Sequence, residues 1–379
     1  MLCSDRQAPG GSAVTHSAIV DADGHIMEVP AQLVTHLPPV YRDSGNILHL
    51  GRLFPQIDHL HSHPIETPFN TRKTRHTVGA DEWIEFLEDV GIEATVLYPS
   101  AALAQGWMTD LDWSVALCRA YNDWLHAEYL QRSERFKGIA IIPMQDPEEA
   151  ALELRRAIEK LGMVGAMIPS NGLPTEIGSK IYWPIYREAD RLGCALAVHG
   201  GSHRGYGMDH FNRYAPAHGI GHPLGQLIGL GSIVFNGIFD KFPNARIGFM
   251  EGGVAWFLMA LERFDRSHET HQQLDPTGQF RGPADGEKVS AYIQRHIQAG
   301  RLFIGCEGSE SLIGKAVEMV GNKPFMFSSD FPHEVNNHFC KEEIEELEEN
   351  AELTDADKAA ILGENARAFY QLTAVPAAV

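Results

Sequence analysis

The sequence is poor in cysteine and in positive charge, and each shortage excludes some classes of site or binding partner. Its 379 residues include five scattered cysteines with no Cys-x-x-Cys pair. Neither a disulfide framework nor a cysteine-type zinc site is therefore expected, and a reducing compartment is the default. The 31 Lys and Arg are outnumbered by 50 Asp and Glu, which gives a formal net charge of -19. A chain this acidic is a poor partner for nucleic acid and for anionic membranes.

Long apolar runs are also missing. No run approaches the length of a membrane span, and residues 1–17 contain Gly, Ser and Pro without the apolar segment of a signal peptide. We therefore predict a flexible tail over residues 1–17, a single domain over residues 18–379 and a cytoplasmic location.

Several common catalytic motifs are absent as well. There is no Walker A lysine, and the Gly-Leu-Gly segment at 229–234 lacks the third glycine of a dinucleotide loop. In the segment 333–338, the second histidine comes one position too late for the His-Glu-x-x-His pattern of zinc peptidases. These absences exclude the nucleotide-binding and zinc-peptidase classes that those motifs indicate.

Eight short β-type segments recur along the chain, most of them almost continuously apolar and most followed by a helical pattern. They cover residues 17–25, 93–100, 138–145, 164–171, 194–201, 245–253, 301–308 and 324–333. Such runs are typical of parallel strands that are buried on both faces. Eight strands alternating with helices predict an α/β fold, a (β/α)8 TIM barrel, with an open doubly wound sheet as the alternative. Residues 26–78 and 202–223 break the alternation and are predicted to be long inserted loops after strands 1 and 5.

Polar residues follow the predicted strands at the ends where a barrel gathers its catalytic groups. Strand 1 ends in Asp23 and His25, strand 5 in His199, strand 6 in Glu251, and strand 8 in Asp330 with His333 shortly after. Each alone is more typical of a polar turn, a buried histidine or a helix cap. Their joint occurrence on one rim favours a divalent metal held through nitrogen and oxygen, such as Zn²⁺ or Mn²⁺.

A family resemblance rests on several segments taken together. They are DADGHIMEVP, RAYNDWL, IPMQDPEEAALELRRAIEKLG, VHGG, GIFDKFPNARIGFMEGGVAW, SSDFPH and ILGENARAFYQL. With them the sequence, from about residue 18 to residue 372, resembles the amidohydrolase superfamily, in the branch that includes aminocarboxymuconate-semialdehyde decarboxylase.

The resemblance implies a barrel with one catalytic divalent metal, or less often two. It implies that the metal ligands are Asp23, His25, His199 and Asp330. Two departures stand out: Asp23 replaces the first histidine of the family's His-x-His pair, and Glu251 replaces its sixth-strand histidine. His222 is expected near the site, on the loop after strand 5. Asp21, deeper in strand 1, is expected to support the ligands.

Carboxylates at these two positions favour activation of a metal-bound water over decarboxylation. The sequence therefore predicts a metal-dependent hydrolase of an acyl compound, that is, an amide, ester, thioester or lactone. Asp330 or Glu251 would take the proton from water, and His222 or His333 would orient the carbonyl or stabilise the oxyanion. Two alternatives remain: a non-oxidative decarboxylase of an aromatic or enoic acid, and an inactive barrel that serves as a binding subunit.

Aromatic residues in the two long segments indicate an apolar and bulky small-molecule substrate. They are Phe54, Phe69, Tyr206, Phe211 and Tyr214. Barrels of this kind commonly pair, so a homodimer is also predicted.

Overall fold

The computed structural model describes residues 18–43, 52–60, 78–201, 203–271, 274, 282–284 and 286–373. The predicted tail over residues 1–17 lies outside this part of the chain. Within it, eight parallel strands pair in chain order to form one sheet. The strands are β1 (Ile19–Ile26), β2 (Ile92–Pro99), β3 (Phe136–Ile141), β4 (Gly165–Pro169), β5 (Ala195–His199), β6 (Arg246–Met250), β7 (Leu302–Cys306) and β8 (Phe325–Phe327).

The first and last strands meet beside the candidate metal ligands. The backbone N–H of His25 donates to the carbonyl of Phe331 at 2.7 Å, and the N–H of Asp330 donates to the carbonyl of Asp23 at 3.0 Å. A doubly wound sheet would instead reverse its strand order and leave both edges apart. The predicted (β/α)8 barrel is confirmed, and its closure brings the carboxyl ends of β1 and β8 together.

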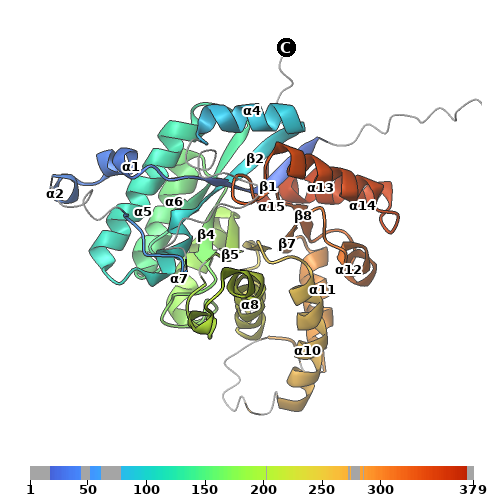
Figure 1. Ribbon diagram of the computed structural model, residues 1–379. Coiled ribbons are helices and arrows are strands. Elements are labelled where there is room, and N and C mark those ends of the chain that lie inside the picture. The colour runs from blue at the N-terminus through green and yellow to red at the C-terminus, as the bar shows by residue number, and fades with distance from the viewer. Residues whose placement is uncertain are drawn as a thin grey trace, which may run out of the picture.

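Helices surround the strands, as Figure 1 shows. The helices of the first half are α1 (Pro30–His36), α2 (Pro39–Arg42), α4 (Ala80–Val90), α5 (Leu111–Leu125), α6 (Pro147–Leu161) and α7 (Trp183–Leu192). Those of the second half are α8 (Tyr214–Phe235), α9 (Ile238–Lys241), α10 (Ala255–His271), α11 (Val289–Gln298), α12 (Ile313–Val320), α13 (Asn337–Glu349), α14 (Asp355–Ala359) and α15 (Asn365–Tyr370). Short 3-10 turns cover Ala101–Trp107, Lys180–Tyr182 and Met208–His210, and π-helical turns cover His126–Leu130 and Ala360–Glu364. No helix in the described ranges is long and apolar enough to cross a membrane.

The segment predicted as a loop after strand 5 is partly helical. Residues 214–223 form the first turns of α8, whereas the prediction placed all of 202–223 in a loop. The Gly- and Pro-rich sequence has low helix propensity, but α8 packs against β5 and β6. Tertiary packing therefore overrides local propensity here. Pro216 lies in the first turn of the helix, where its missing N–H costs nothing.

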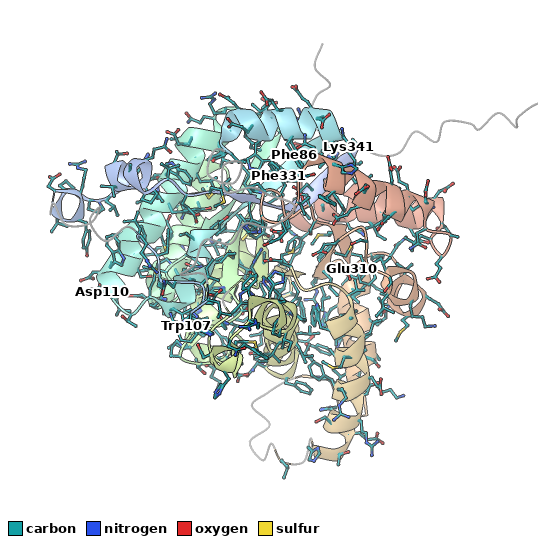
Figure 2. The ribbon with its side chains drawn as sticks, in the orientation of Figure 1. Phe86, Trp107, Asp110, Glu310, Phe331 and Lys341 are labelled. Carbon is teal, nitrogen blue, oxygen red and sulfur yellow. The ribbon has the colours of Figure 1, made fainter. Side chains whose placement is uncertain are left out.

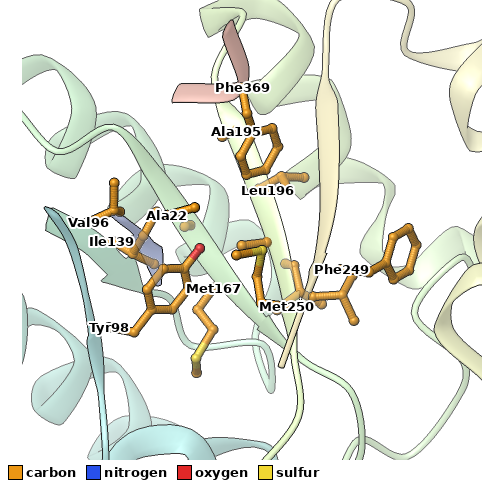
Figure 3. Packing of buried hydrophobic residues seen from close by; sticks show 14 of the residues in the cluster. Ala22, Val96, Tyr98, Ile139, Met167, Ala195, Leu196, Phe249, Met250 and Phe369 are labelled. Carbon is orange, nitrogen blue, oxygen red and sulfur yellow. The ribbon is translucent and has the colours of Figure 1, made fainter. Parts of the chain in front are cut away.

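Side chains from the strands and from the C-terminal helix fill the barrel beneath the site. Figure 3 shows Tyr98, Met167 and Met250 among the buried residues packed between the strands. The hydroxyl of Tyr370 in α15 donates to the carbonyl of Ala22 at 2.8 Å and lies 2.6 Å from the hydroxyl of Tyr98. The Tyr98 ring in turn lies 5.0 Å from the ring of His199. These contacts give the candidate site a rigid floor.

Aromatic packing outside the barrel supports the closing segment. Phe331 stacks on Phe86 of α4 with ring centroids 3.8 Å apart, and the two side chains lie next to each other in Figure 2. Trp83, on the same helix, contacts Phe331 edge to face at 4.8 Å. The indole N–H of Trp83 donates to the carbonyl of His25 at 3.1 Å. Helix α4 thereby holds the ends of β1 and β8 in register.

Candidate metal centre

The four predicted metal ligands lie together at the carboxyl ends of β1, β5 and β8. His25 Nε2 lies 3.5 Å from Asp23 Oδ1 and 3.4 Å from Asp330 Oδ1. His199 Nε2 lies 3.2 Å from Asp23 Oδ2. Asp23, His25 and His199 each offer a ligand atom within 4.8 Å of the others, and so do His25, Asp330 and His333. The structure thus gathers side chains that are up to 307 residues apart into one constellation.

Backbone carbonyls fix which ring nitrogen of each histidine faces the centre. His25 Nδ1 lies 2.7 Å from the carbonyl oxygen of Pro99, and His199 Nδ1 lies 2.9 Å from that of Gly200. A carbonyl only accepts, so both Nδ1 atoms carry a proton and both Nε2 atoms face the centre. His25 Nε2 is buried and has no hydrogen-bond partner among the described residues. This is the arrangement that orients a histidine toward a metal.

The charges around the centre also fit a cation. Asp23 is 1% exposed, and burial raises the pKa of its carboxyl. Burial, together with the charges of Glu251 and Glu334, raises the pKa of Asp330 well above its usual range. Within the described part of the chain, the ion-pair partners of Asp23, Asp330 and Glu251 are histidines rather than Lys or Arg. A divalent cation would supply the positive charge that these buried carboxylates need.

Burial has the opposite effect on His25. It lowers the pKa of the imidazole well below its usual value, and the nearby charges of His333 and His199 lower it further. For His199, burial also lowers the pKa, but the charge of Asp23 and its hydrogen bond outweigh burial and raise the pKa to about 9. His25 is therefore neutral at physiological pH, the form in which a histidine binds metal.

Asp21 connects β1 to β2 and to the segment after β8 rather than facing the centre. Its carboxylate accepts from the Thr95 hydroxyl at 2.6 Å and from the backbone N–H and hydroxyl of Ser329 at 2.8 and 2.9 Å. These bonds, with one from the N–H of Asp23 at 3.2 Å, occupy both oxygens. Asp21 thus holds β1, β2 and the segment before Asp330 together.

Gly24 of β1 lies so close to Trp83, Thr95 and Asp21 that any side chain there would collide with them. An added Cβ would meet the Trp83 ring, Thr95 Oγ1 at 2.7 Å and Asp21 Oδ2 at 2.8 Å. We expect Gly24→Ala to lower the free energy of unfolding by about 1–3 kcal/mol, because overpacking forces the neighbours to shift. Urea denaturation measures this change. Gly219→Ala, on α8 with nothing within 4 Å of the new Cβ, is the control and should be neutral or slightly stabilising. Equal stability of the two variants would contradict the expectation.

Two of the predicted catalytic residues adopt the left-handed backbone conformation. Glu251 follows β6 with φ of 53°, and Asp330 follows β8 with φ of 52°. Residues other than glycine rarely adopt this conformation, and such strain concentrates at functional sites. Both strained carboxylates lie at the rim of the barrel, next to the candidate ligands.

The remaining predicted residues flank the centre on two sides. The ring of His333 stacks on that of His25 at 4.0 Å, with Nδ1 2.8 Å from Asp330 Oδ1 and Nε2 2.8 Å from the Ser100 hydroxyl. His222 lies on α8, not on a loop as predicted, with Nδ1 3.2 Å from Glu251 Oε2.

Sequence reasoning missed His218. It lies four residues before His222, so both histidines project from one face of α8 and together with Glu251 form a third group of potential ligands. The His-x-x-x-His spacing at 218–222 would have revealed the pair if the segment had been predicted as a helix.

A small pocket lies between the ends of β6, β7 and β8. It is lined by Asp23, Glu251, Gly252, Gly253, Gly305, Cys306, Glu307, Ser328 and Asp330. None of the aromatic residues predicted to contact a substrate belongs to this lining. Phe54 is 4% exposed and packs in the core, and Phe69 lies outside the described residues.

Comparisons with known proteins agree with this geometry. A family model described as amidohydrolase matches residues 20–372. A gamma-resorcylate decarboxylase of Rhodococcus jostii is 26% identical over 316 residues, which cover 77% of this chain and 87% of that protein. The 2-amino-3-carboxymuconate-6-semialdehyde decarboxylase of Dictyostelium discoideum is 25% identical over 293 residues, 77% of this chain and 76% of that protein.

Solved structures share the fold. A 5-carboxyvanillate decarboxylase of Novosphingobium aromaticivorans, complexed with manganese and 4-hydroxy-3-methoxy-5-nitrobenzoic acid, superposes with a TM-score of 0.68 at 18% identity. The superposition covers 97% of this chain and all of that one.

The predicted hydrolase function is wrong. The curated relatives named above are decarboxylases, which agrees with the alternative reading of the sequence. The prediction rested on Glu251 and Asp23 replacing histidines and so favouring water activation. In the structure, Glu251 Oε2 lies 3.2 Å from His222 Nδ1 and 3.5 Å from His199 Nδ1, so its carboxylate is surrounded by histidines. A carboxylate at this position does not by itself indicate water activation.

Proposed function

Because the chain belongs to the amidohydrolase family, we propose that it is a metal-dependent enzyme that removes CO₂ without oxidation from an aromatic or enoic carboxylic acid. The observation that carries the proposal is the cluster of Asp23, His25, His199 and Asp330, whose ligand atoms converge on one rim of the barrel. The curated decarboxylases that resemble the chain support the reaction class. The manganese in a structural relative supports the type of cation.

The four residues would hold one divalent cation, with Mn²⁺ favoured by two carboxylates beside two imidazoles. Such a cation, when bound, would hold the carboxylate and a neighbouring hydroxyl of the substrate and neutralise charge that develops during the reaction. The chain itself fixes the ligands through the carbonyls of Pro99 and Gly200 and through Trp83 of α4.

The reaction breaks one carbon–carbon bond and forms one carbon–hydrogen bond. CO₂ leaves the substrate carbon, and a proton replaces it there. We assign the delivery of this proton to the carboxyl of Asp330, because Asp330 Oδ1 lies 3.4 Å from His25 Nε2 in the centre and 2.8 Å from His333 Nδ1. The Ser100 hydroxyl, the His333 ring and Asp330 Oδ1 form a continuous set of contacts of 2.8 Å each. This path would resupply the proton to Asp330 after each turnover.

Glu251 adds negative charge next to His199 and His222. Although burial raises its pKa, the charges of His222, His199 and His25 lower that pKa well below the usual value. We assign to this enzyme an aromatic carboxylic acid such as a hydroxylated benzoate, because a gamma-resorcylate decarboxylase is among the relatives of the chain.

The reaction is tested by product analysis on a panel of hydroxybenzoates with added Mn²⁺. We expect release of CO₂, one deuterium on the ring of the product in D₂O, and no ¹⁸O in the organic product in labelled water. His25→Gln protein serves as the control for metal-independent breakdown. Turnover of an ester, amide or lactone with ¹⁸O in the product and no CO₂ from any acid of the panel would contradict the proposal.

The alternative of an inactive barrel makes a different prediction. It requires that protein purified without chelator contain no stoichiometric metal. The homodimer and the cytoplasmic location also stay predictions, and light scattering of the purified chain measures the first of them.

A further inference from the structure

A cluster of three histidines lies next to Glu251, on the side away from Asp23. His218 and His222 come from α8, and His203 comes from the segment after β5. The ring centroids of His203 and His222 are 4.6 Å apart, those of His218 and His222 are 4.8 Å apart, and those of His203 and His218 are 5.5 Å apart. Ligand atoms of His218, His222 and Glu251 all lie within 4.8 Å of one another.

Buried polar atoms of this cluster have no hydrogen bonds. Among the described residues, His222 Nδ1 and Glu251 Oε2 have no hydrogen-bond partner. The two ring nitrogens of His203 also have none in the described part of the chain. His222 is 6% exposed and His203 is 2% exposed, so bulk water does not replace these bonds. Unsatisfied buried polar atoms are costly and call for a bound group. The 3.2 Å between His222 Nδ1 and Glu251 Oε2 places a nitrogen and an oxygen ligand side by side.

We propose that His218, His222 and Glu251 form a second divalent-cation site, distinct from the centre of Asp23, His25, His199 and Asp330. Two imidazoles and one carboxylate are the ligand set that Zn²⁺ and similar cations prefer, whereas Mg²⁺ and Ca²⁺ prefer oxygen. The histidines at i and i+4 of α8 present both rings on one helix face, the geometry in which a helix binds a metal through two histidines.

The residues around the cluster are explained better by a bound metal than by an isolated ion pair between His222 and Glu251. His203 Nδ1 lies 3.6 Å from Asp58 Oδ2, so a second buried carboxylate borders the cluster. A simple His222–Glu251 ion pair would not explain His218, whose ligand atom lies within 4.8 Å of both partners.

The backbone near His222 is built to let the ring approach the barrel. A Cβ at Gly200, directly after β5, would lie 2.5 Å from His222 Nδ1. Only glycine therefore allows the imidazole to reach the rim beside Glu251. Glu251 Oε2 is also 3.5 Å from His199 Nδ1, so this carboxylate connects the second site to a ligand of the first.

The test is a metal count on full-length protein from which any affinity tag has been removed. Protein stripped with chelator is reloaded with Zn²⁺, passed through a desalting column and analysed by mass spectrometry of the elements. We expect two Zn²⁺ per chain for the wild type, one for His218→Gln, one for His25→Gln and none for the double variant. His210→Gln, which removes an exposed histidine just before α8, should keep two. A wild type with one Zn²⁺, or a His218→Gln variant that keeps two, would overturn the proposal.

A second measurement does not depend on how the variants fold. Anomalous diffraction at the zinc edge from wild-type crystals soaked in Zn²⁺ should give a peak between His218, His222 and Glu251. Density for the three side chains without such a peak would overturn the proposal. Both measurements count metal and require no turnover, so they are independent of the proposed decarboxylation, and either conclusion can fail without the other.

Discussion

Asp330→Asn is expected to reduce kcat for decarboxylation by about 10²- to 10⁴-fold, the usual contribution of a positioned acid. An amide has the shape of the carboxyl but cannot deliver a proton to carbon. Asparagine also tolerates the φ of 52° at this position, so the backbone should not change. The assay uses the substrate found with the panel, at a Mn²⁺ concentration that saturates the variant, because Asp330 is also assigned as a ligand.

The control for Asp330→Asn is Asp43→Asn, which removes a carboxylate that is 66% exposed. It should keep wild-type kcat and metal content. If Asp330→Asn with a full complement of metal keeps kcat within about tenfold of the wild type, another group delivers the proton and the assignment of Asp330 is wrong.

Asp23→Asn is expected to weaken metal binding at the first centre by at least about 10- to 100-fold, the loss that removal of a mere supporting group already causes. The amide keeps the volume of the side chain, which is 1% exposed, but removes the charge that would offset the cation. Metal content after desalting and a titration of activity with Mn²⁺ measure the effect. Treatment of the wild type with chelator should abolish activity in the same way, and Mn²⁺ should restore it.

Asp21→Asn tests whether a carboxylate supports the metal ligands or binds the metal itself. Asp21 lies two residues before Asp23 on β1 and is assigned the supporting role. Its carboxylate accepts from Thr95 and Ser329. Loss of a buried acceptor costs about 1–3 kcal/mol, so this variant should be less stable while its folded fraction keeps the metal. If Asp21→Asn lost metal and Asp23→Asn kept it, the roles assigned to the two residues would be reversed.

Local sequence patterns predicted the architecture well, because parallel strands buried on both faces leave apolar runs that no exposed element shows. The same patterns placed Asp23, His25, His199 and Asp330 at strand ends, and a barrel necessarily gathers such ends on one rim. The start of α8 could not be predicted in this way, because glycine and proline lower helix propensity and the helix is stabilised by packing against β5, β6 and α10. His218 was missed as a consequence.

The reaction was predicted wrongly for a related reason. Residue types at Glu251 and Asp23 suggested water activation, but the chemistry of a carboxylate depends on its neighbours. The left-handed backbone at Glu251, its contacts with His222 and His199 and the burial of Asp330 are properties of the folded chain. None of these properties can be predicted from the residues adjacent in the sequence.

The sequence by itself thus determined the barrel and the polar residues at its strand ends, because these depend on hydrophobic periodicity and on the types of residue present. The choice of Asp23, His25, His199 and Asp330 among them as candidate ligands came from the family resemblance. The tertiary structure alone decided which ring nitrogens face the centre, through the carbonyls of Pro99 and Gly200. It also decided that α8 brings His218 and His222 to Glu251, which forms a second set of ligands. Distances of a few ångströms between residues far apart in the chain set protonation and coordination, and only the closed barrel fixes those distances.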